Sequence, residues 1–562
     1  MPLWSTLFLP PTILVAGAIV LWLARRYLPD RPPLTLWLHD ALPLAFLLAA
    51  ALAWITHPPD ASPFRLLVLP PGLGIDVALS ARLDAWGRLF GLLLLWSALL
   101  AAWPTPREGR SGQDAARPFP QPASAWLILA AALLVLFAAD WPTLATTLLL
   151  VDLVYLTVAP TPNGRAFIAN ALGCLGLLAA TFILATDTLN LSLTADQSLP
   201  ATAKLLVIAA SLIRLAPYPL HFWLTDAAET AAPPEWPLQL ISPGLGLYLL
   251  TRLSPRLIGP IPLPAAIQII GMAGALLVSL LAWHSAQRHP RRAISLIELY
   301  QLNLALSSWV FTRQPSTGFW MACNLALGAT ASTTHCIWLS AAGDGRLAWR
   351  DRLPGGVGVA SLAGLPLTVG FLVRLPLYRA LLDGGQAGWL ALTLLAESLT
   401  IAALLRLWNG QGRSDQPQIT ARPWSVWGAA SLQTAPLLLL GLFPSLATRL
   451  ADVSPGHAAL QSLSTIGSLT SGGIGLWAAL LLPLAMGYGL YRSQMPWPVE
   501  WADRAARLAT LFQLDWLHRA VGRFLDQTRQ AVWSMGALLH GEGYLAWVAF
   551  SIVLLFVLIL NR

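Results

Sequence analysis

The chain has 562 residues, of which 56% are hydrophobic and only 11% are charged. A soluble domain carries about 25% charged residues, so this composition excludes a soluble multi-domain enzyme and indicates a polytopic membrane protein. The formal net charge of +8 does not indicate a nucleic-acid partner, because the arginines gather in alternate loops between apolar spans. That asymmetry is typical of cytoplasmic loops and predicts an N-terminus on the outer side.

Counting apolar windows of about 18 residues or more predicts roughly 14 to 16 membrane helices. In chain order they lie near residues 7–24, 38–56, 84–103, 123–139, 142–159, 166–186, 202–224, 237–253, 262–285, 292–312, 316–342, 356–382, 387–408, 424–445, 471–491 and 544–561. The alternation of a β-barrel is absent, so the expected fold is all-α.

Two of these spans are interrupted, which suggests inverted repeats that contain broken helices. The expected divisions are N-terminal membrane helices over 1–122, a first repeat over 123–253, a second repeat over 254–408, peripheral membrane helices over 409–491, an amphipathic basic helix on the cytoplasmic face over 492–543, and a last membrane helix over 544–562.

The first interruption lies within residues 201–253. Arg214 falls in the middle of an apolar span, and Pro217 and Pro219 follow it. Each proline removes a backbone donor, so the helix should end just past the arginine, with the carbonyls of Ile213 and Leu215 facing the cation. A buried charge at a broken helix usually marks an ion or proton path. The alternative is an arginine that ties two helices together through carbonyls or a carboxylate.

The second interruption lies within residues 356–382. Gly364, Pro366 and Gly370 precede Arg374, and Pro376 follows it. Two broken segments that carry charge, one in each half, indicate a path near the middle of the bilayer. The three cysteines are isolated within apolar spans, so the sequence predicts neither a disulfide framework nor a metal or iron–sulfur site. We expect no cofactor.

Several motifs follow one another along the chain. They are Asp84 in an early Arg-Leu-Asp, the run Pro219, Leu220, His221, Trp223, Leu224, Asp226 and Ala227, then Gly246, Tyr248 and Leu249, the pair Arg291 and Arg292, Gln301, the segment from His335 to Gly343, and Gly364-Leu365-Pro366 to Gly370-Phe371. In this order they resemble the motifs of the antiporter-like, proton-conducting membrane subunits of respiratory complex I, Mrp cation/proton antiporters and group-4 hydrogenases. The resemblance covers roughly residues 70 to 445.

The resemblance implies a buried chain of an acid, a lysine, a histidine or lysine, and a final lysine or glutamate. Here Arg214 and Arg374 stand at the two outer lysine positions, and His335 stands at the middle one. The histidine of the intervening helix falls at Gln239 or Leu238, depending on a one-residue gap. The partner acid has no direct counterpart: Asp152 is the nearest, two residues late relative to the spacing from Asp140.

Arginine is not deprotonated in proteins, so the two arginines are expected to act as fixed charges. The residues that could take up and release protons would then be His335, Asp152, Glu298 and Glu397. Of these, the histidine has the most suitable ordinary pKa. The open alternatives are that Glu397 pairs with a buried arginine, that His335 is a satisfied core histidine, and that Asp226 caps the loop after its helix.

The function implied by the resemblance is that of an antiporter-like subunit of a multisubunit complex that moves protons or monovalent cations. Two alternatives use the same fold: a membrane partner in an inorganic-carbon uptake complex, and a structural subunit that has lost conduction. Other membrane subunits and lipid are the expected partners, and a bacterial cytoplasmic membrane is the expected location. No dinucleotide fingerprint is present, so redox chemistry in this chain is not expected. The chain would fit as a subunit of a larger translocating enzyme.

Overall fold

The computed structural model describes residues 7–27, 32–56, 63–68, 78–102, 121–158, 164–186, 191–193, 198–221, 223–224, 240–257, 264–286, 289–312, 315–329, 349–409, 423–446 and 471–493, with 523, 527 and 548 as single positions. The chain forms two compact units, Met1–Ala506 and Arg507–Arg562. The helices expected over 492–543 and 544–562 lie almost wholly outside the described residues. The proposed repeat boundaries stay predictions.

Within the first unit, the described residues up to Leu257 are almost entirely α-helical. Its helices are α2 (Leu9–Tyr27), α3 (Pro32–Thr56), α4 (Ala85–Ala102), α5 (Gln121–Leu136), α6 (Trp141–Val158), α7 (Gly164–Thr186), α8 (Ala201–Leu215) and α11 (Ile241–Leu253), the last followed by the 3₁₀ turn η4 (Ser254–Leu257). Between α3 and α4, β1 (Phe64–Val68) and β2 (Ala78–Ala81) pair in an antiparallel ladder. This small ladder was not predicted from the sequence.

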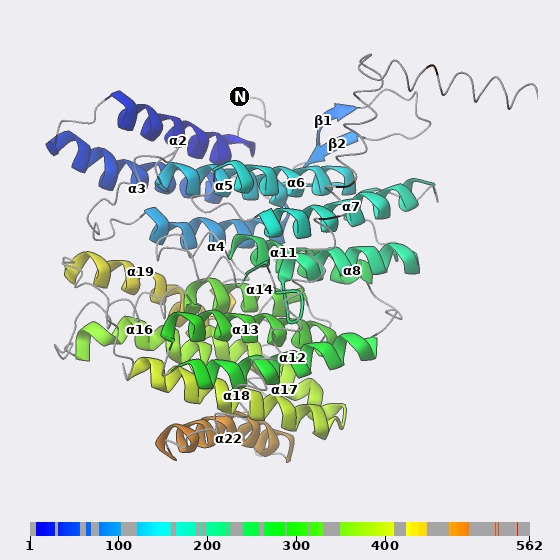
Figure 1. The fold of residues 1–562 in the computed structure, drawn as a ribbon, viewed down its shortest axis with the longest axis vertical. Helices are drawn as coiled ribbons and strands as arrows, with labels where there is room; N and C mark the ends of the chain where they lie inside the picture. The colour runs from blue at the N-terminus through cyan, green and yellow to red at the C-terminus, as the bar shows by residue number, and fades with distance from the viewer. Residues whose placement is uncertain are drawn as a thin grey trace, which may run out of the picture. The chain divides into compact units, whose positions relative to one another are not determined.

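The later helices continue the same pattern. They are α12 (Pro264–Ser285), α13 (Pro290–Thr312), α14 (Pro315–Cys323) with its π-helical extension η5 (Asn324–Ala329), α16 (Trp349–Leu362), α17 (Val369–Asp383), α18 (Ala387–Trp408), α19 (Pro423–Leu442) and α22 (Ser471–Ser493). Figure 1 shows these helices lying side by side, with α7 against α8, α12 against α13, and α18 between α12 and α22.

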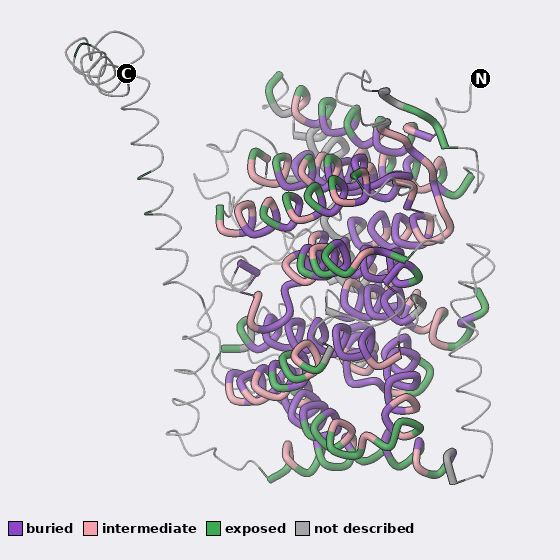
Figure 2. The backbone as a smooth tube through the Cα atoms, turned by 90° about the vertical axis from the view of Figure 1, so that its right-hand side faces the viewer, coloured by how far each residue is buried: buried purple, intermediate pink, exposed green. Residues whose placement is uncertain are grey.

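The apolar character of the helices fits a multi-pass membrane protein. Six described helices are long and apolar enough to cross a membrane by length and composition, and further apolar helices are shorter. Figure 2 shows exposed residues along the outward faces and buried ones in the interior. The outward faces of α7, α12 and α22 carry large apolar side chains such as Leu175, Phe182, Ile269, Trp477 and Leu481. An exposed apolar surface of this extent is what lipid contact requires.

One helix lies at the centre. In the apolar stretch of α13 that is long enough to cross a membrane, 94% of the residues are buried, against 33% in the corresponding stretch of α22. Yet α13 carries many polar side chains, including Glu298, Gln301, Asn303, Ser307 and Ser308, all buried. A helix that is polar and enclosed by other helices is expected to line an internal polar path rather than face lipid.

Both expected helix breaks are confirmed. The first helix, α8, ends at Leu215, and Ala216 adopts a left-handed backbone conformation with φ +54. The second break separates α16 from α17, where Gly364 and Leu367 have φ of +73 and +70. Prolines in the first break and glycine with proline in the second prevent the helical ladder from continuing.

Candidate functional site: buried arginine–carboxylate pairs at the helix breaks

The last turn of α8 positions the first pair. Arg214 donates from Nη1 to Oδ1 of Asp152 at 3.0 Å and from Nη2 to Oδ2 at 2.6 Å. The two side chains are only 3% and 4% exposed. A bidentate pair of this kind is strong and directional, and each partner compensates the burial of the other.

Asp140, twelve residues before Asp152 in the chain, has a capping role. Its Oδ1 accepts a hydrogen bond from the backbone N–H of Thr143 at 2.8 Å, and its Oδ2 accepts one from the hydroxyl of Ser80. Asp140 therefore caps the start of α6, which its spacing before Thr143 predicts. Asp152, the nearest candidate for the partner acid in the sequence, is the residue that meets Arg214.

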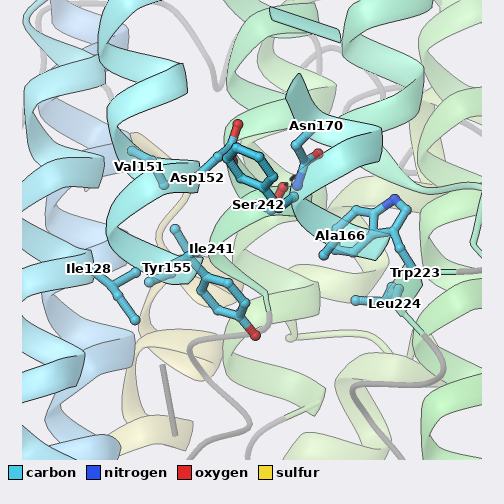
Figure 3. Close-up of a pocket in the computed structure, with 11 residues that line it drawn as sticks. Ile128, Val151, Asp152, Tyr155, Ala166, Asn170, Trp223, Leu224, Ile241 and Ser242 are labelled. Carbon is cyan, nitrogen blue, oxygen red and sulfur yellow. Dashed lines mark hydrogen bonds between the residues drawn. The ribbon is translucent and has the colours of Figure 1, made fainter. Parts of the chain in front are cut away.

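A thiol and a pocket flank the first pair. The Sγ atom of Cys174 on α7 lies 3.4 Å from Nη2 of Arg214 and 3.6 Å from Oδ2 of Asp152. A pocket lined by Asp152, Tyr155 and Asn170, among others, reaches the acid of the pair (Figure 3). Its volume of ≈ 30 Å³ is room for about two water molecules. Asp152 is thus buried but lies beside a small cavity with mainly apolar walls.

The segment after α8 closes the first break. Trp223 donates its indole N–H to the carbonyl of Ile213 at 3.1 Å. The expectation that this carbonyl faces Arg214 is therefore wrong: the tryptophan satisfies the freed carbonyl, and the cation turns to Asp152. His221 is 6% exposed and stacks on Tyr218, with ring centroids 4.9 Å apart.

The second pair joins α17 to α18. Arg374 donates from Nε to Oε1 of Glu397 at 2.6 Å, and these side chains are 2% and 1% exposed. The same guanidinium donates to the carbonyl of Gly370 at 3.0 Å and to that of Leu362 at 2.6 Å. Tyr378 donates its hydroxyl to the other oxygen of Glu397. Arg374 thus connects the end of α16 to the start of α17, as well as pairing with an acid.

A network of amides and hydroxyls supports the second break. Gln301 on α13 donates to the carbonyl of Leu362 at 3.1 Å, the carbonyl that Arg374 also uses. Asn324, the first residue of η5, donates to Gln301 at 3.3 Å and accepts from the hydroxyl of Ser361 at 2.8 Å. The hydroxyl of Ser361 accepts from the backbone N–H of Gly370 at 3.1 Å. The start of α17 is therefore fixed by groups from α13, η5 and α16.

A third ion pair joins buried Arg252 to the partly exposed Asp84. The Nε atom of Arg252 on α11 lies 2.7 Å from Oδ2 of Asp84, and its Nη1 donates to the hydroxyl of Tyr248 at 2.6 Å. Asp84 also accepts from the backbone N–H of Gly87 at 2.6 Å, which caps α4. Sequence reasoning names Asp84 but misses Arg252, because an arginine near a helix end reads as a flanking cation. The signal that would have found it is the i, i+4 spacing from Tyr248.

The remaining sequence-predicted residues fall in several places. Glu298 is buried in α13, and Arg292 is exposed at the start of that helix. Gln239, Asp226, His335 and the side chain of Arg291 lie outside the described residues, so their predicted roles stay predictions. In the described part of the chain, no group of three or more His, Cys, Asp or Glu side chains forms a metal-binding cluster.

Comparisons with known proteins agree on the fold. No protein-family model matches this sequence, and no curated protein matches it either. Among solved structures, the chain is similar to one in the Mrp complex from Dietzia sp. DQ12-45-1b, with a TM-score of 0.70 and 20% identity over 98% of this chain and 63% of that one. The chain therefore spans less than two thirds of the length of that Mrp chain.

A second similarity is to a chain of respiratory complex I from Thermus thermophilus with bound Aureothin. The TM-score is 0.59 and the identity 20%, over 79% of this chain and 99% of that one. Both similar structures are membrane complexes of the classes that the sequence motifs indicate. The chain has the fold of these two chains of the Mrp complex and of respiratory complex I.

Proposed function

We propose that this chain is the antiporter-like subunit of a multisubunit complex that moves protons along a buried polar axis. The observation that carries the proposal is the pair of arginine–carboxylate contacts, Arg214–Asp152 and Arg374–Glu397, each at a break in a membrane helix. Buried ionisable groups at discontinuous helices are characteristic of ion and proton paths.

The arginines act as fixed charges in this proposal. A guanidinium does not release its proton, so the exchangeable protons belong to Asp152 and Glu397, with Tyr378 donating to the latter. A carboxylate whose two oxygens both accept hydrogen bonds has little room for a proton. Proton transfer at Asp152 therefore requires Arg214 to withdraw, and the break at Ala216 is where the backbone would yield.

Protons are favoured over sodium as the transported ion. A bare monovalent cation at Asp152 would meet the guanidinium of Arg214, whose Nη2 is 2.6 Å from the carboxylate oxygen. Two like charges within a few Å in a medium of low dielectric repel each other strongly. A proton escapes this repulsion because it neutralises the carboxyl group by forming a covalent bond.

The assembly and location follow from the same fold. Mrp and complex I are multisubunit membrane complexes, and we extend that arrangement to this chain, with other membrane subunits as its partners. The proposed location is a bacterial cytoplasmic membrane, with the N-terminus outside as the arginine distribution favours. His335, Gln239 and Glu298 remain proposed members of the path on sequence grounds.

A structural role without conduction is the second candidate. It is favoured by Arg374, whose bonds to Leu362, Gly370 and Glu397 hold two helices and a break together. On that account the arginines stabilise a subunit that packs a larger assembly. The two accounts differ in whether neutralising a pair changes flux or only assembly.

Proton flux in vesicles containing the purified complex separates the two candidates. The test variant is Asp152→Asn with Arg214→Gln, which removes both charges yet keeps hydrogen-bonding groups. Its control is Asp84→Asn with Arg252→Gln, which neutralises an ion pair that is not part of the proposed path. Both variant complexes are first shown to assemble, and both are assayed in sodium-free buffer. We expect proton flux to be lost in the Asp152/Arg214 variant and kept in the control. Unchanged flux in the assembled Asp152 variant would overturn the proposal, and wild-type complex without flux would favour the structural role.

A further inference from the structure

The two ion pairs lie in different halves, and the described residues contain a polar seam between them. On the first side, the segment after α8 places His221 and Tyr218 together as stacked rings. On the second side, α13 presents Asn303, Ser307 and Tyr300. Residues at i, i+3 and i+7 share one face of a helix, so these three side chains form a single stripe along α13.

Glycines of α12 bring the two sides into contact. A Cβ atom on Gly274 would lie 2.7 Å from Oδ1 of Asn303 and 3.0 Å from Cβ of Tyr218. A Cβ atom on Gly271 would lie 3.0 Å from the hydroxyl oxygen of Ser307. Because both positions lack a side chain, the first break and the polar stripe of α13 meet across the bare backbone of α12.

The polar atoms along this seam have unused hydrogen-bonding capacity. Within the described part of the chain, Nδ1 of His221, Oδ1 of Asn303 and the hydroxyl of Ser307 are buried without a hydrogen-bond partner. Asn303 is 0% and Ser307 1% exposed. Buried polar groups in proteins are nearly always satisfied by protein or by ordered water. Three such atoms from two facing elements are groups whose hydrogen bonds bound water would complete.

The far end of the stripe reaches the second ion pair. Tyr300 is fully buried on α13 and interacts electrostatically with both Glu397 and Arg374. Asn303 follows it by three residues on the same face. The seam therefore extends from the break beside Arg214 to the neighbourhood of Glu397, through side chains of α13.

We propose that Asn303 is a positioning residue that holds water between His221 and Tyr300, so that protons pass between the two ion pairs along α13. The inference rests on the proposed proton function and gives it a route. The amide binds water and releases no proton, while the imidazole of His221 is the titratable member of the seam. Water that bridges polar groups costs little to hold and joins donors to acceptors over distances that direct bonds do not span.

The flux experiment uses Asn303→Leu in the full chain within its complex. This substitution keeps a side chain of similar size and removes the water-binding amide. We expect proton flux to fall by about 100-fold, the scale on which removing one proton-transfer element changes a rate. Asn303→Ser should restore much of the flux, because a hydroxyl still binds water. If Asn303 had only a structural role, the smaller serine would not restore the flux. The control is Ser279→Ala on α12, whose buried hydroxyl already bonds the carbonyl of Leu276.

A second measurement does not depend on flux. A high-resolution cryo-electron microscopy map of the wild-type complex should contain water within hydrogen-bonding distance of Oδ1 of Asn303. A dry seam, or equal flux in Asn303→Leu and wild type, would overturn the inference. If the wild-type complex conducts no protons, the proposed function fails, and the water density alone decides whether the seam is hydrated.

Discussion

Gly364 lies directly against the side chain of Arg374. A Cβ atom on this glycine would come within 2.5 Å of Nε and 2.8 Å of Cζ, and its φ of +73 is one that other residues rarely adopt. The guanidinium therefore occupies the space that a side chain at position 364 would need. The second break is shaped to hold an arginine beside Glu397, and that relationship leads to the first prediction.

Gly364→Ala should lower the stability of the protein by more than the cost of placing alanine in a left-handed backbone conformation. The left-handed conformation costs about 1–2 kcal/mol for a residue with a Cβ atom. Displacing Arg374 from Glu397 adds the cost of disturbing a buried pair. The matched control is Gly385→Ala, where φ is +63 and no atom lies within 4 Å of the added Cβ. Thermal unfolding of both variants in detergent measures the difference, and equal midpoints would contradict the contact.

Gly246→Ala tests the close approach of α11 to the first break. The added Cβ atom would lie 2.7 Å from the backbone nitrogen and 2.9 Å from the Cα atom of Leu215. Backbone has no alternative rotamer, so the helices must separate, at a cost of about 1–3 kcal/mol. Gly244→Ala, in the same helix with nothing within 4 Å, is the control. The account requires a lower melting temperature for the first variant and no change for the second.

Neutralising one partner of the Arg214–Asp152 pair should destabilise the protein more than neutralising both. Asp152→Asn leaves Arg214 charged and buried, and loss of one partner of a buried pair costs about 3–5 kcal/mol. Adding Arg214→Gln to the same chain should recover much of that stability, since no unpaired charge remains. A double-mutant cycle on unfolding free energies measures this coupling. Additive effects of the two substitutions would mean that the side chains do not interact.

Lysine should be less well tolerated at position 374 than at position 214. Arg214 bonds one carboxylate and one thiol, and a lysine can still meet that carboxylate, although with one contact in place of the bidentate pair. Arg374 bonds three groups in different directions, and its planar fork cannot be matched by an ammonium. We expect Arg374→Lys to lose about 1.5–3 kcal/mol for each charged hydrogen bond that is not remade. Equal stability of the two lysine variants would contradict the distinct roles assigned to the two arginines.

The helix breaks were predictable, whereas for the partners of the two arginines the sequence offered only candidates. Pro217 and Pro219 prevent the helix from continuing, and α8 ends at Leu215 as expected. The choice between carbonyl and carboxylate ligands for Arg214 depends on Asp152, which lies 62 residues away in sequence. Helical periodicity gives the face of each residue but not the rotation of one helix against another, so an acid two residues out of register still reached the arginine.

The second half illustrates the same limit. The sequence allows Glu397 to pair with a buried arginine, and this is what the structure contains. The amide network of Gln301 and Asn324 was not predicted beyond the motif position of Gln301. It depends on η5, where the helix widens to a π turn that no local residue preference specifies. Wider turns of this type occur often at functional sites.

The most direct test of the central claim is proton flux through the wild-type complex compared with Glu397→Gln and Asp383→Asn. Glu397 is the buried partner of Arg374, whereas Asp383 is an exposed acid near the end of α17 whose ion pair with Arg379 lies at the surface. The account predicts that Glu397→Gln abolishes flux in an assembled complex while Asp383→Asn leaves it unchanged. Undiminished flux in Glu397→Gln would contradict the claim that the buried pairs carry the protons.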